Sequence, residues 1–124
     1  KGHWDKILSI SYFPDGQRMI SGSCDTTVQQ WDLKTGKEFV ETGIVKTFKG
    51  HSREWITCID ISADNTRLAS GSNDRTARIW NLDTDKLTVG TPFKGHTYNI
   101  SGLTLSFDDS LLASAFLDNI IKLW

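Results

Sequence analysis

The sequence lacks several features that mark common classes of protein. It has only two cysteines, Cys24 and Cys58, and neither belongs to a Cys-x-x-Cys or Cys/His cluster, which argues against a disulfide scaffold and a metal site. No apolar run approaches the roughly 20 residues that a membrane helix needs. The first residues, KGHWDK, are not a secretory signal. We therefore expect an intracellular protein, cytoplasmic or nuclear, with reduced thiols.

A strong charge of either sign is also missing. The 14 basic and 15 acidic residues are interspersed, and the formal net charge is -1, so nothing electrostatic indicates nucleic acid or an anionic membrane as the partner. Glycine-rich phosphate loops, a signature of paired carboxylates in a cleft and a Gly-x-Ser-x-Gly nucleophile motif are absent. Nucleotide binding and glycoside hydrolysis therefore have no support, and we expect no cofactor and no metal.

What the sequence does contain is one unit repeated three times. Gly-His stands at residues 2–3, 50–51 and 95–96, and a tryptophan follows each histidine after 28, 29 and 28 residues. An aspartate stands six positions before each tryptophan. Because this inner spacing is nearly constant while the connectors vary, each unit is predicted to be one structural module. We place the units at residues 1–49, 50–94 and 95–124.

Within each unit the apolar pattern has a period of two, which predicts strands rather than helices. The predicted first strands are 7–13, 56–62 and 100–106, each followed by Asp- or Asn-containing turn residues. The second strands are 18–23, 67–72 and 111–115, and a third strand ends at each tryptophan. Residues 38–48 and 86–93 supply a fourth. Such sheets carry apolar residues on both faces, so they must stack on neighbours.

These residues resemble the WD-repeat (WD40) β-propeller family. The resemblance rests on Gly-His near the start of a unit, a strand like Leu-Ala-Ser-Gly-Ser, Asp-x-Thr in the turn and Trp-Asp at the close. Only the first unit ends in Trp-Asp; the second has Trp80 followed by Asn81, and the third stops at Trp124. The resemblance implies an all-β fold with blades of four antiparallel strands, here a three-blade arc in one propeller domain whose third blade lacks its last strand.

The resemblance also implies a role for the repeated aspartate, because in such propellers a histidine, a serine or threonine, the turn aspartate and the tryptophan form a hydrogen-bond chain within each blade. Two serines compete for the hydroxyl position. We choose the one four residues before the aspartate, since the alternative position holds Phe116 in the third unit. The predicted structural tetrads are His3, Ser21, Asp25, Trp31; His51, Ser70, Asp74, Trp80; and His96, Ser114, Asp118, Trp124.

Ser, His and Asp together also raise the possibility of a hydrolase triad. The set occurs three times without a nucleophile elbow, and repetition favours an architectural role. A metal site built from the three histidines is disfavoured, because equivalent residues of neighbouring blades lie many ångströms apart. We therefore predict that the protein is not an enzyme.

In propellers of this kind the loop after Gly-His and the turn with the aspartate form the usual contact face. Aromatic residues and arginine tend to dominate interface energetics, although the aromatic residues could instead simply cap their blades. Lys6 and Arg53 alone do not make a phosphate-binding cluster. The predicted partner-binding residues are Trp4, Asp5, Lys6, Arg53, Glu54, Trp55, Asn73, Tyr98 and Asn99.

We accordingly predict a non-catalytic scaffold or adaptor that binds a protein or peptide. The alternative is a propeller sensor or regulatory module of a larger ATP-hydrolysing, NACHT-type signalling protein, to which the spacers TFKGH and PFKGH bear a loose likeness. Propellers usually close with about 4–8 blades. Three blades do not make a ring, so we expect either a segment of a longer propeller chain, as the start at Lys1 also suggests, or a ring closed by association of copies.

Overall fold

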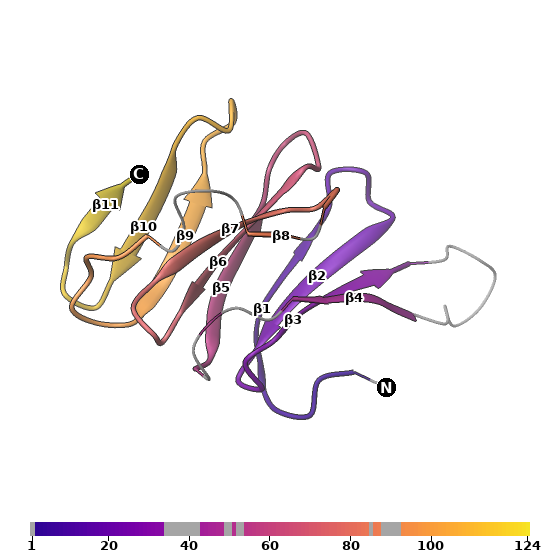
Figure 1. Ribbon diagram of the computed structural model, residues 1–124, viewed down its shortest axis with the longest axis horizontal. Helices are drawn as coiled ribbons and strands as arrows, with labels where there is room; N and C mark the ends of the chain where they lie inside the picture. Colours follow the sequence, from indigo (N-terminus) through magenta and orange to yellow (C-terminus); the bar gives the residue numbers. More distant parts are fainter. Residues whose placement is uncertain (1, 34–42, 49–50, 52–53, 85, 88–92) are drawn as a thin grey trace.

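The computed structural model describes residues 2–33, 43–48, 51, 54–84, 86–87 and 93–124. Within these ranges the chain forms eleven strands and no helix. The strands make three antiparallel sheets that stand side by side as a fan, in the order of the sequence (Figure 1). The fan is open, because the first and third sheets are not joined. The predicted all-β fold with blade-like sheets is confirmed.

Each sheet follows the order of its strands along the chain. The first sheet contains β1 (Ile7–Tyr12), β2 (Arg18–Ser23), β3 (Val28–Asp32) and β4 (Gly43–Phe48). The second contains β5 (Ile56–Ile61), β6 (Arg67–Ser72), β7 (Ala77–Asn81) and β8 (Lys86–Leu87), and the third contains β9 (Ile100–Leu105), β10 (Leu112–Phe116) and β11 (Ile121–Leu123). Parts of the predicted fourth strands, residues 38–42 and 88–92, lie outside the described residues.

The turn between the first two strands of every sheet is built around an aspartate. Asp15, Asp64 and Asp108 each accept a hydrogen bond from the backbone N–H two residues further on, at 2.8, 3.0 and 3.1 Å. The residue after Asp15, Asp64 or Asp108 has a positive φ, of 68°, 64° and 59°. Glycine, asparagine and aspartate tolerate this conformation best, and they are the residues found there. Local turn chemistry therefore sets the pairing of these strands.

Glycines on the second strands allow neighbouring sheets to approach closely. A Cβ atom at Gly22 would lie 2.6 Å from Cγ2 of Ile56 in the next sheet, and one at Gly71 would lie 2.6 Å from Cγ2 of Ile100. Ile56 is 1% exposed and Ile100 is fully buried. Burial of such a side chain stabilises the fold by about 1.5–3 kcal/mol. We call each such contact between neighbouring sheets, at Gly22 with Ile56 and at Gly71 with Ile100, a joint. The core therefore consists of two joints between sheets, not of one central cluster.

The outer face of the first sheet has no neighbour among the described residues. Ile7 and Ile10 of β1 occupy the positions that Ile56 and Ile59 occupy in β5. Ile56 and Ile59 are 1% and 8% exposed because they pack on the first sheet, whereas Ile7 and Ile10 are 54% and 60% exposed. The residues that form a joint elsewhere are thus uncovered here.

The outer face of the third sheet is uncovered as well. It carries a hollow of about 260 Å³ bordered by Gly102, Ala113, Ala115 and Ile121. Ile121 is 73% exposed. Ala115 stands where the first two sheets have the glycines that receive the next sheet. Both ends of the fan therefore present apolar surface that resembles half of an internal joint.

Candidate functional site

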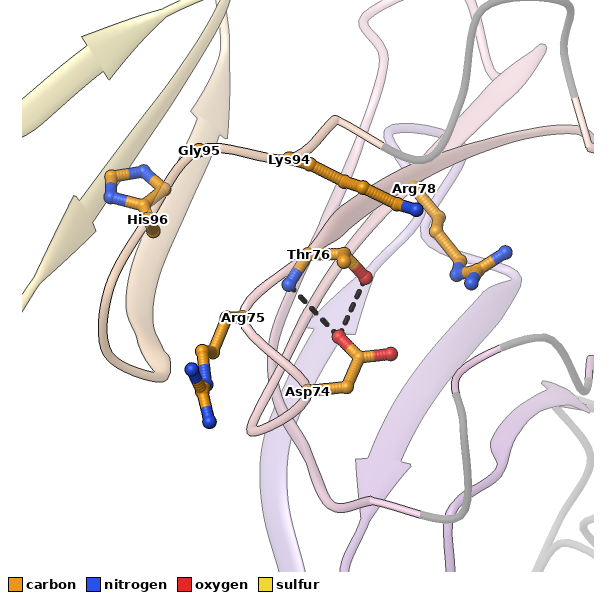
Figure 2. A pocket seen from close by; sticks show the side chains of 7 residues that line it. All are labelled: Asp74, Arg75, Thr76, Arg78, Lys94, Gly95 and His96. Atoms are coloured by element: carbon orange, nitrogen blue, oxygen red, sulfur yellow. Dashed lines mark hydrogen bonds between the residues drawn. The ribbon is translucent and has the colours of Figure 1, made fainter.

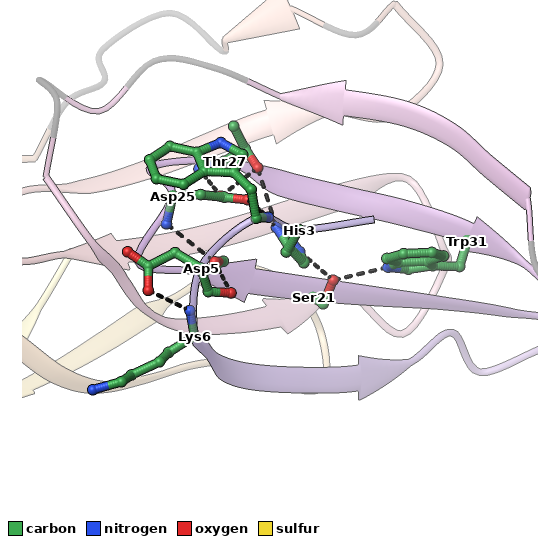
Figure 3. A network of polar contacts seen from close by, with 9 residues as sticks. His3, Asp5, Lys6, Ser21, Asp25, Thr27 and Trp31 are labelled. Carbon is green, nitrogen blue, oxygen red and sulfur yellow. Dashed lines mark hydrogen bonds and ion pairs between the residues drawn. The ribbon is translucent and has the colours of Figure 1, made fainter. Parts of the chain in front are cut away.

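A hydrogen-bond chain crosses the first sheet from its N-terminal loop to β3 (Figure 3). The ring of His3 donates from Nδ1 to Oδ2 of Asp25 at 2.7 Å, and Nε2 accepts from Oγ of Ser21 at 2.6 Å. The indole N–H of Trp31 donates to the same serine oxygen at 2.8 Å. The proton belongs on Nδ1 because a carboxylate can only accept. The chain therefore ties the Gly-His loop to β2 and β3.

The second sheet contains the same arrangement. His51 donates to Asp74 at 2.9 Å and accepts from Ser70 at 2.8 Å, and the indole N–H of Trp80 donates to Ser70 at 3.2 Å. His51 and Ser70 are 7% and 0% exposed. Buried polar atoms that lack partners are costly, so a chain that satisfies each of them stabilises the blade.

A threonine two residues after the aspartate supports both chains, and the predicted tetrads did not include it. Thr27 donates its hydroxyl to Asp25 at 2.7 Å, and Thr76 donates to Asp74 at 2.6 Å. Burial alone would raise the pKa of Asp25 and of Asp74. The hydrogen bonds from threonine and histidine outweigh burial and lower both pKa values. The Asp-x-Thr pattern in the sequence was the signal for this residue.

The set in the third sheet is incomplete. His96 accepts from Ser114 at 2.7 Å, and Trp124 donates to Ser114 at 2.9 Å. The Nδ1 atom of His96, however, lies 3.9 Å from Oδ2 of Asp118, beyond hydrogen-bond range, and it is buried without a partner among the described residues. The predicted link between His96 and Asp118 is therefore absent from this structure.

Two substitutions within the third unit explain the open link. In the first unit the hydroxyl of Ser23 accepts from the backbone N–H of Asp25, and Thr27 holds the carboxylate. The third unit has Phe116 and Ile120 at these positions, which offer no hydroxyl. Thr97 instead donates to Asp118 at 3.3 Å. Burial first, and then the positive charge of Lys122, lower the pKa of His96, which favours the neutral form of its ring.

The three tetrad serines are not accessible nucleophiles. Ser21, Ser70 and Ser114 are 1%, 0% and 1% exposed, and each hydroxyl lies between an imidazole and an indole. A triad nucleophile must reach its substrate. The three histidines lie in separate sheets, and among the described residues no group of three or more His, Cys, Asp or Glu side chains could hold a metal ion. This geometry supports an architectural role for the tetrads.

Backbone hydrogen bonds gather the Gly-His loops and the aspartate turns at one end of the sheets. The N–H of Cys24 donates to the carbonyl of Lys6 at 2.8 Å, and the N–H of Asn73 donates to the carbonyl of Trp55 at 3.0 Å. We call this end the loop face; it comprises residues 4–6, 24–26, 54–55, 73–75, 97–99 and 117–119. The loop face therefore combines segments from every unit.

Aromatic side chains of the loop face extend into solvent. Trp4, Trp55 and Tyr98 are 78%, 50% and 58% exposed, more than expected of residues that only cap a blade. Asp5 and Lys6 are exposed too, whereas Cys24 is buried. The remaining predicted residues are placed as follows: Glu54 accepts from the side chain of Asn73 at 3.2 Å, Asn99 is half-buried, and Arg53 lies outside the described residues.

A groove crosses the loop face between the second and third sheets. Its volume is about 560 Å³. It brings together three predicted residues, Asn73, Tyr98 and Asn99, with two that the sequence analysis missed, Arg75 and Thr97. Both missed residues are close in sequence to predicted ones, but nothing in the repeat pattern separates them from ordinary loop positions. The groove thus combines hydrogen-bonding side chains with one large aromatic side chain.

Comparison with known proteins places these features in a family. The family model described as "WD domain, G-beta repeat" matches residues 1–32, 43–81 and 87–124. Among the relatives, the small ribosomal subunit protein RACK1 of Candida albicans is 35% identical over 159 aligned residues, which cover 100% of this chain and 50% of that protein. The guanine nucleotide-binding protein subunit beta of Zea mays is 29% identical, over 99% of this chain and 33% of its own length.

Other relatives match a shorter part of the chain. The Notchless protein homolog of Arabidopsis thaliana is 53% identical over 34 residues, 27% of this chain and 7% of its own. The chain spans half or less of the length of these relatives. In the part of the chain that the structure describes, no helix has the length and apolar character to cross a membrane.

Proposed function

The chain belongs to the WD-repeat family, and from this premise we propose that it is a non-catalytic interaction scaffold that binds a protein or peptide through the loop face. The observation that carries the proposal is the groove beside Tyr98, together with the exposure of Trp4, Trp55 and Tyr98. Exposed aromatic side chains supply large contact areas at small entropic cost and are common energetic centres of interfaces. An intracellular location is part of the proposal.

The buried tetrad serines support the non-catalytic part of this proposal. The alternative of a sensor module in an ATP-hydrolysing signalling protein receives no support, because neither the family model nor the names of the relatives reported above refer to such a protein. One of these relatives is named as a ribosomal protein and another as a guanine nucleotide-binding protein subunit. We take from them only the scaffold class.

A site-specific photo-crosslinker tests the loop face directly. We would place it at position 98 and, as a control, at position 107, because Phe107 is 92% exposed and lies beyond the other end of β9. Trp55 provides a second test position in the next unit. Reproducible adducts with another polypeptide from positions 55 and 98, but not from position 107, are expected. Equal adducts from all three positions, or adducts only from position 107, would refute the proposal.

We also propose that further blades cover the two end faces of the fan, either from a longer chain or from associated copies. The exposed Ile7 and Ile10 at one end and the hollow beside Ala115 at the other support this, since each matches one side of the internal joints. Light scattering after size exclusion tests it on the 124-residue chain. A discrete dimer or trimer indicates closure by copies, and aggregation of the isolated chain indicates a need for further blades. A soluble monomer at high concentration would contradict both.

A further inference from the structure

A second hollow, of about 390 Å³, lies where the second sheet meets the segment that leads to the third (Figure 2). We call it the cationic hollow. Three of its residues, Arg75, Arg78 and Lys94, carry a positive charge. Their side chains form no ion pair or hydrogen bond with any residue that the structure describes. The full lining is Asp74, Arg75, Thr76, Arg78, Lys94, Gly95 and His96.

The one carboxylate in the cationic hollow is already engaged. Asp74 accepts from His51 through Oδ2, and from both the amide and the hydroxyl of Thr76 through Oδ1, at 2.9, 2.9 and 2.6 Å. Its charge is therefore directed into the tetrad of the second sheet. The ring of His96 is turned away from the three cations (Figure 2). The lining therefore holds three cations and one carboxylate, which leaves the hollow with an excess of positive charge.

The arrangement of the three cations would be stabilised by a bound anion. Figure 2 shows the ammonium group of Lys94 extending toward Arg78, and Arg75 lies on the other side of Thr76. The Nε atom of Arg78 is buried and has no hydrogen-bond acceptor among the described residues. Like charges brought together repel, and a buried guanidinium N–H without an acceptor is unfavourable. An anion between these side chains would relieve both costs.

Further positive charge surrounds the hollow. Lys122 of β11 donates its ammonium group to the carbonyl of Gly95, at the rim. Asp118, in the aspartate turn of the third unit, is held by Thr97 and by the N–H of Ile120. The local balance thus favours a negative ligand, although the chain as a whole has a formal net charge of only -1. The sequence shows no basic cluster here, because Lys94 lies 16 or more residues after Arg75 and Arg78.

We propose that the cationic hollow binds a negatively charged side chain of the partner, either a carboxylate or a phosphorylated hydroxyl. Guanidinium groups suit both, because their planar N–H donors match the oxygens of carboxylate and phosphate. This inference rests on the proposed function, since Arg75 lines both the cationic hollow and the groove beside Tyr98. A peptide lying in the groove can place an acidic side chain next to Arg75.

Two substitutions remove charge from the hollow while preserving the fold. Arg75 has a positive φ of 70°, and Asn119 occupies the same position of the third unit with a φ of 62°. Asparagine accepts this conformation better than arginine, so Arg75→Asn removes a charge without adding strain. Lys94→Gln removes the exposed ammonium group. A matched control removes two charges from the opposite end of the second sheet, by Arg67→Gln and Lys86→Gln.

The first experiment uses inorganic phosphate and free glutamate as probes. Each is titrated into the full protein at low salt while the backbone amide signals of Arg75, Thr76 and Gly95 are followed by NMR. Saturable shifts are expected at these amides, with binding weakened about tenfold by the double substitution Arg75→Asn and Lys94→Gln and changed by less than about twofold in the control. Absence of saturable shifts, or equal weakening in the control, overturns the proposal.

The second experiment identifies the source of the charge and separates this inference from the scaffold function. Degenerate peptides with a fixed phosphoserine, glutamate or serine are compared for binding. Preference for phosphoserine or for glutamate over serine supports the hollow and names the anion, while equal binding of all three overturns it. If the double variant still gives the full yield of position-98 crosslinks, the scaffold function stands and the anion site is refuted. If the protein with Arg75 and Lys94 intact crosslinks no more from position 98 than from position 107, the scaffold function itself is refuted.

Discussion

Replacement of Asp74 by alanine should destabilise the protein far more than replacement of Asp118. The Asp74 carboxylate holds the buried ring of His51, whose side chain is 1% exposed, and also the hydroxyl of Thr76. A buried hydrogen-bond donor left without an acceptor lowers the free energy of unfolding by about 1–3 kcal/mol. The amide and hydroxyl of Thr76 can bond partly to water instead, and removal of a largely buried carboxylate recovers some desolvation energy. Together these terms give an expected loss of about 2–3 kcal/mol for Asp74→Ala.

Asp118 provides the matched comparison, because His96 already lacks this hydrogen bond, with 3.9 Å between Nδ1 and the carboxylate. Its replacement by alanine leaves no additional buried donor without an acceptor, and we expect a loss below about 1 kcal/mol. Urea unfolding measures both values as shifts of the midpoint at constant slope. Equal losses in the two variants, or no loss in Asp74→Ala, would refute the assignment of stability to a closed tetrad.

Three further perturbations test the packing and the titrating groups. Gly71→Ala should lower the free energy of unfolding by about 1–3 kcal/mol, because its Cβ would lie 2.6 Å from both Cys58 and Ile100. Gly102→Ala should be nearly neutral, because nothing lies within 4 Å of the added Cβ. Equal effects of the two variants in urea unfolding would contradict the close packing of the second and third sheets at Gly71. The pKa of His96 is lowered by burial and by Lys122, so the unfolded chain binds the proton first. Stability should therefore fall as the pH drops below about 6.5 toward the folded pKa, and a His96→Gln variant that kept the same unfolding midpoints across this range as the unsubstituted protein would contradict this. Burial raises the pKa of Cys58 to about 11, so iodoacetamide should label this thiol only in the unfolded protein, as a labelling time course read by mass spectrometry would show.

The fold was predictable because the signals for it are local and repeated. A period of two in the apolar residues, turn residues at fixed places and the spacing of Gly-His to Trp recur in every unit. The structure confirms the predicted all-β class and the predicted stack of sheets that does not close into a ring. Strand ends were less predictable: β10 begins at Leu112, one residue later than expected, because pairing with β9 sets its ends.

The state of each tetrad could not be read from its four residues alone. The third unit has the same His, Ser, Asp and Trp as the others, yet its histidine and aspartate are 3.9 Å apart. The difference lies in Phe116 and Ile120, which replace hydroxyl groups that hold the aspartate in the first unit. Residues around a hydrogen-bond network thus decided its geometry.

The proposed binding residues between the second and third sheets were only partly predictable. Asn73 and Tyr98 follow from the family resemblance, because each lies in a loop known by its place in the repeat. Arg75, Arg78 and Lys94 form the cationic hollow only after the chain has turned from one sheet toward the next. No spacing rule within one repeat brings such residues together, since the site is formed by a joint between repeats.

The central claim is that the loop face binds the partner while the tetrads only support it. The most direct test measures both properties on one variant, Trp55→Ala with Tyr98→Ala, using the affinity for a crosslinked partner and the free energy of unfolding. Both side chains are half exposed or more. We predict that the affinity falls at least about tenfold while the free energy of unfolding stays within about 0.5 kcal/mol. An unchanged affinity, or a loss of affinity that only accompanies unfolding, would contradict the claim.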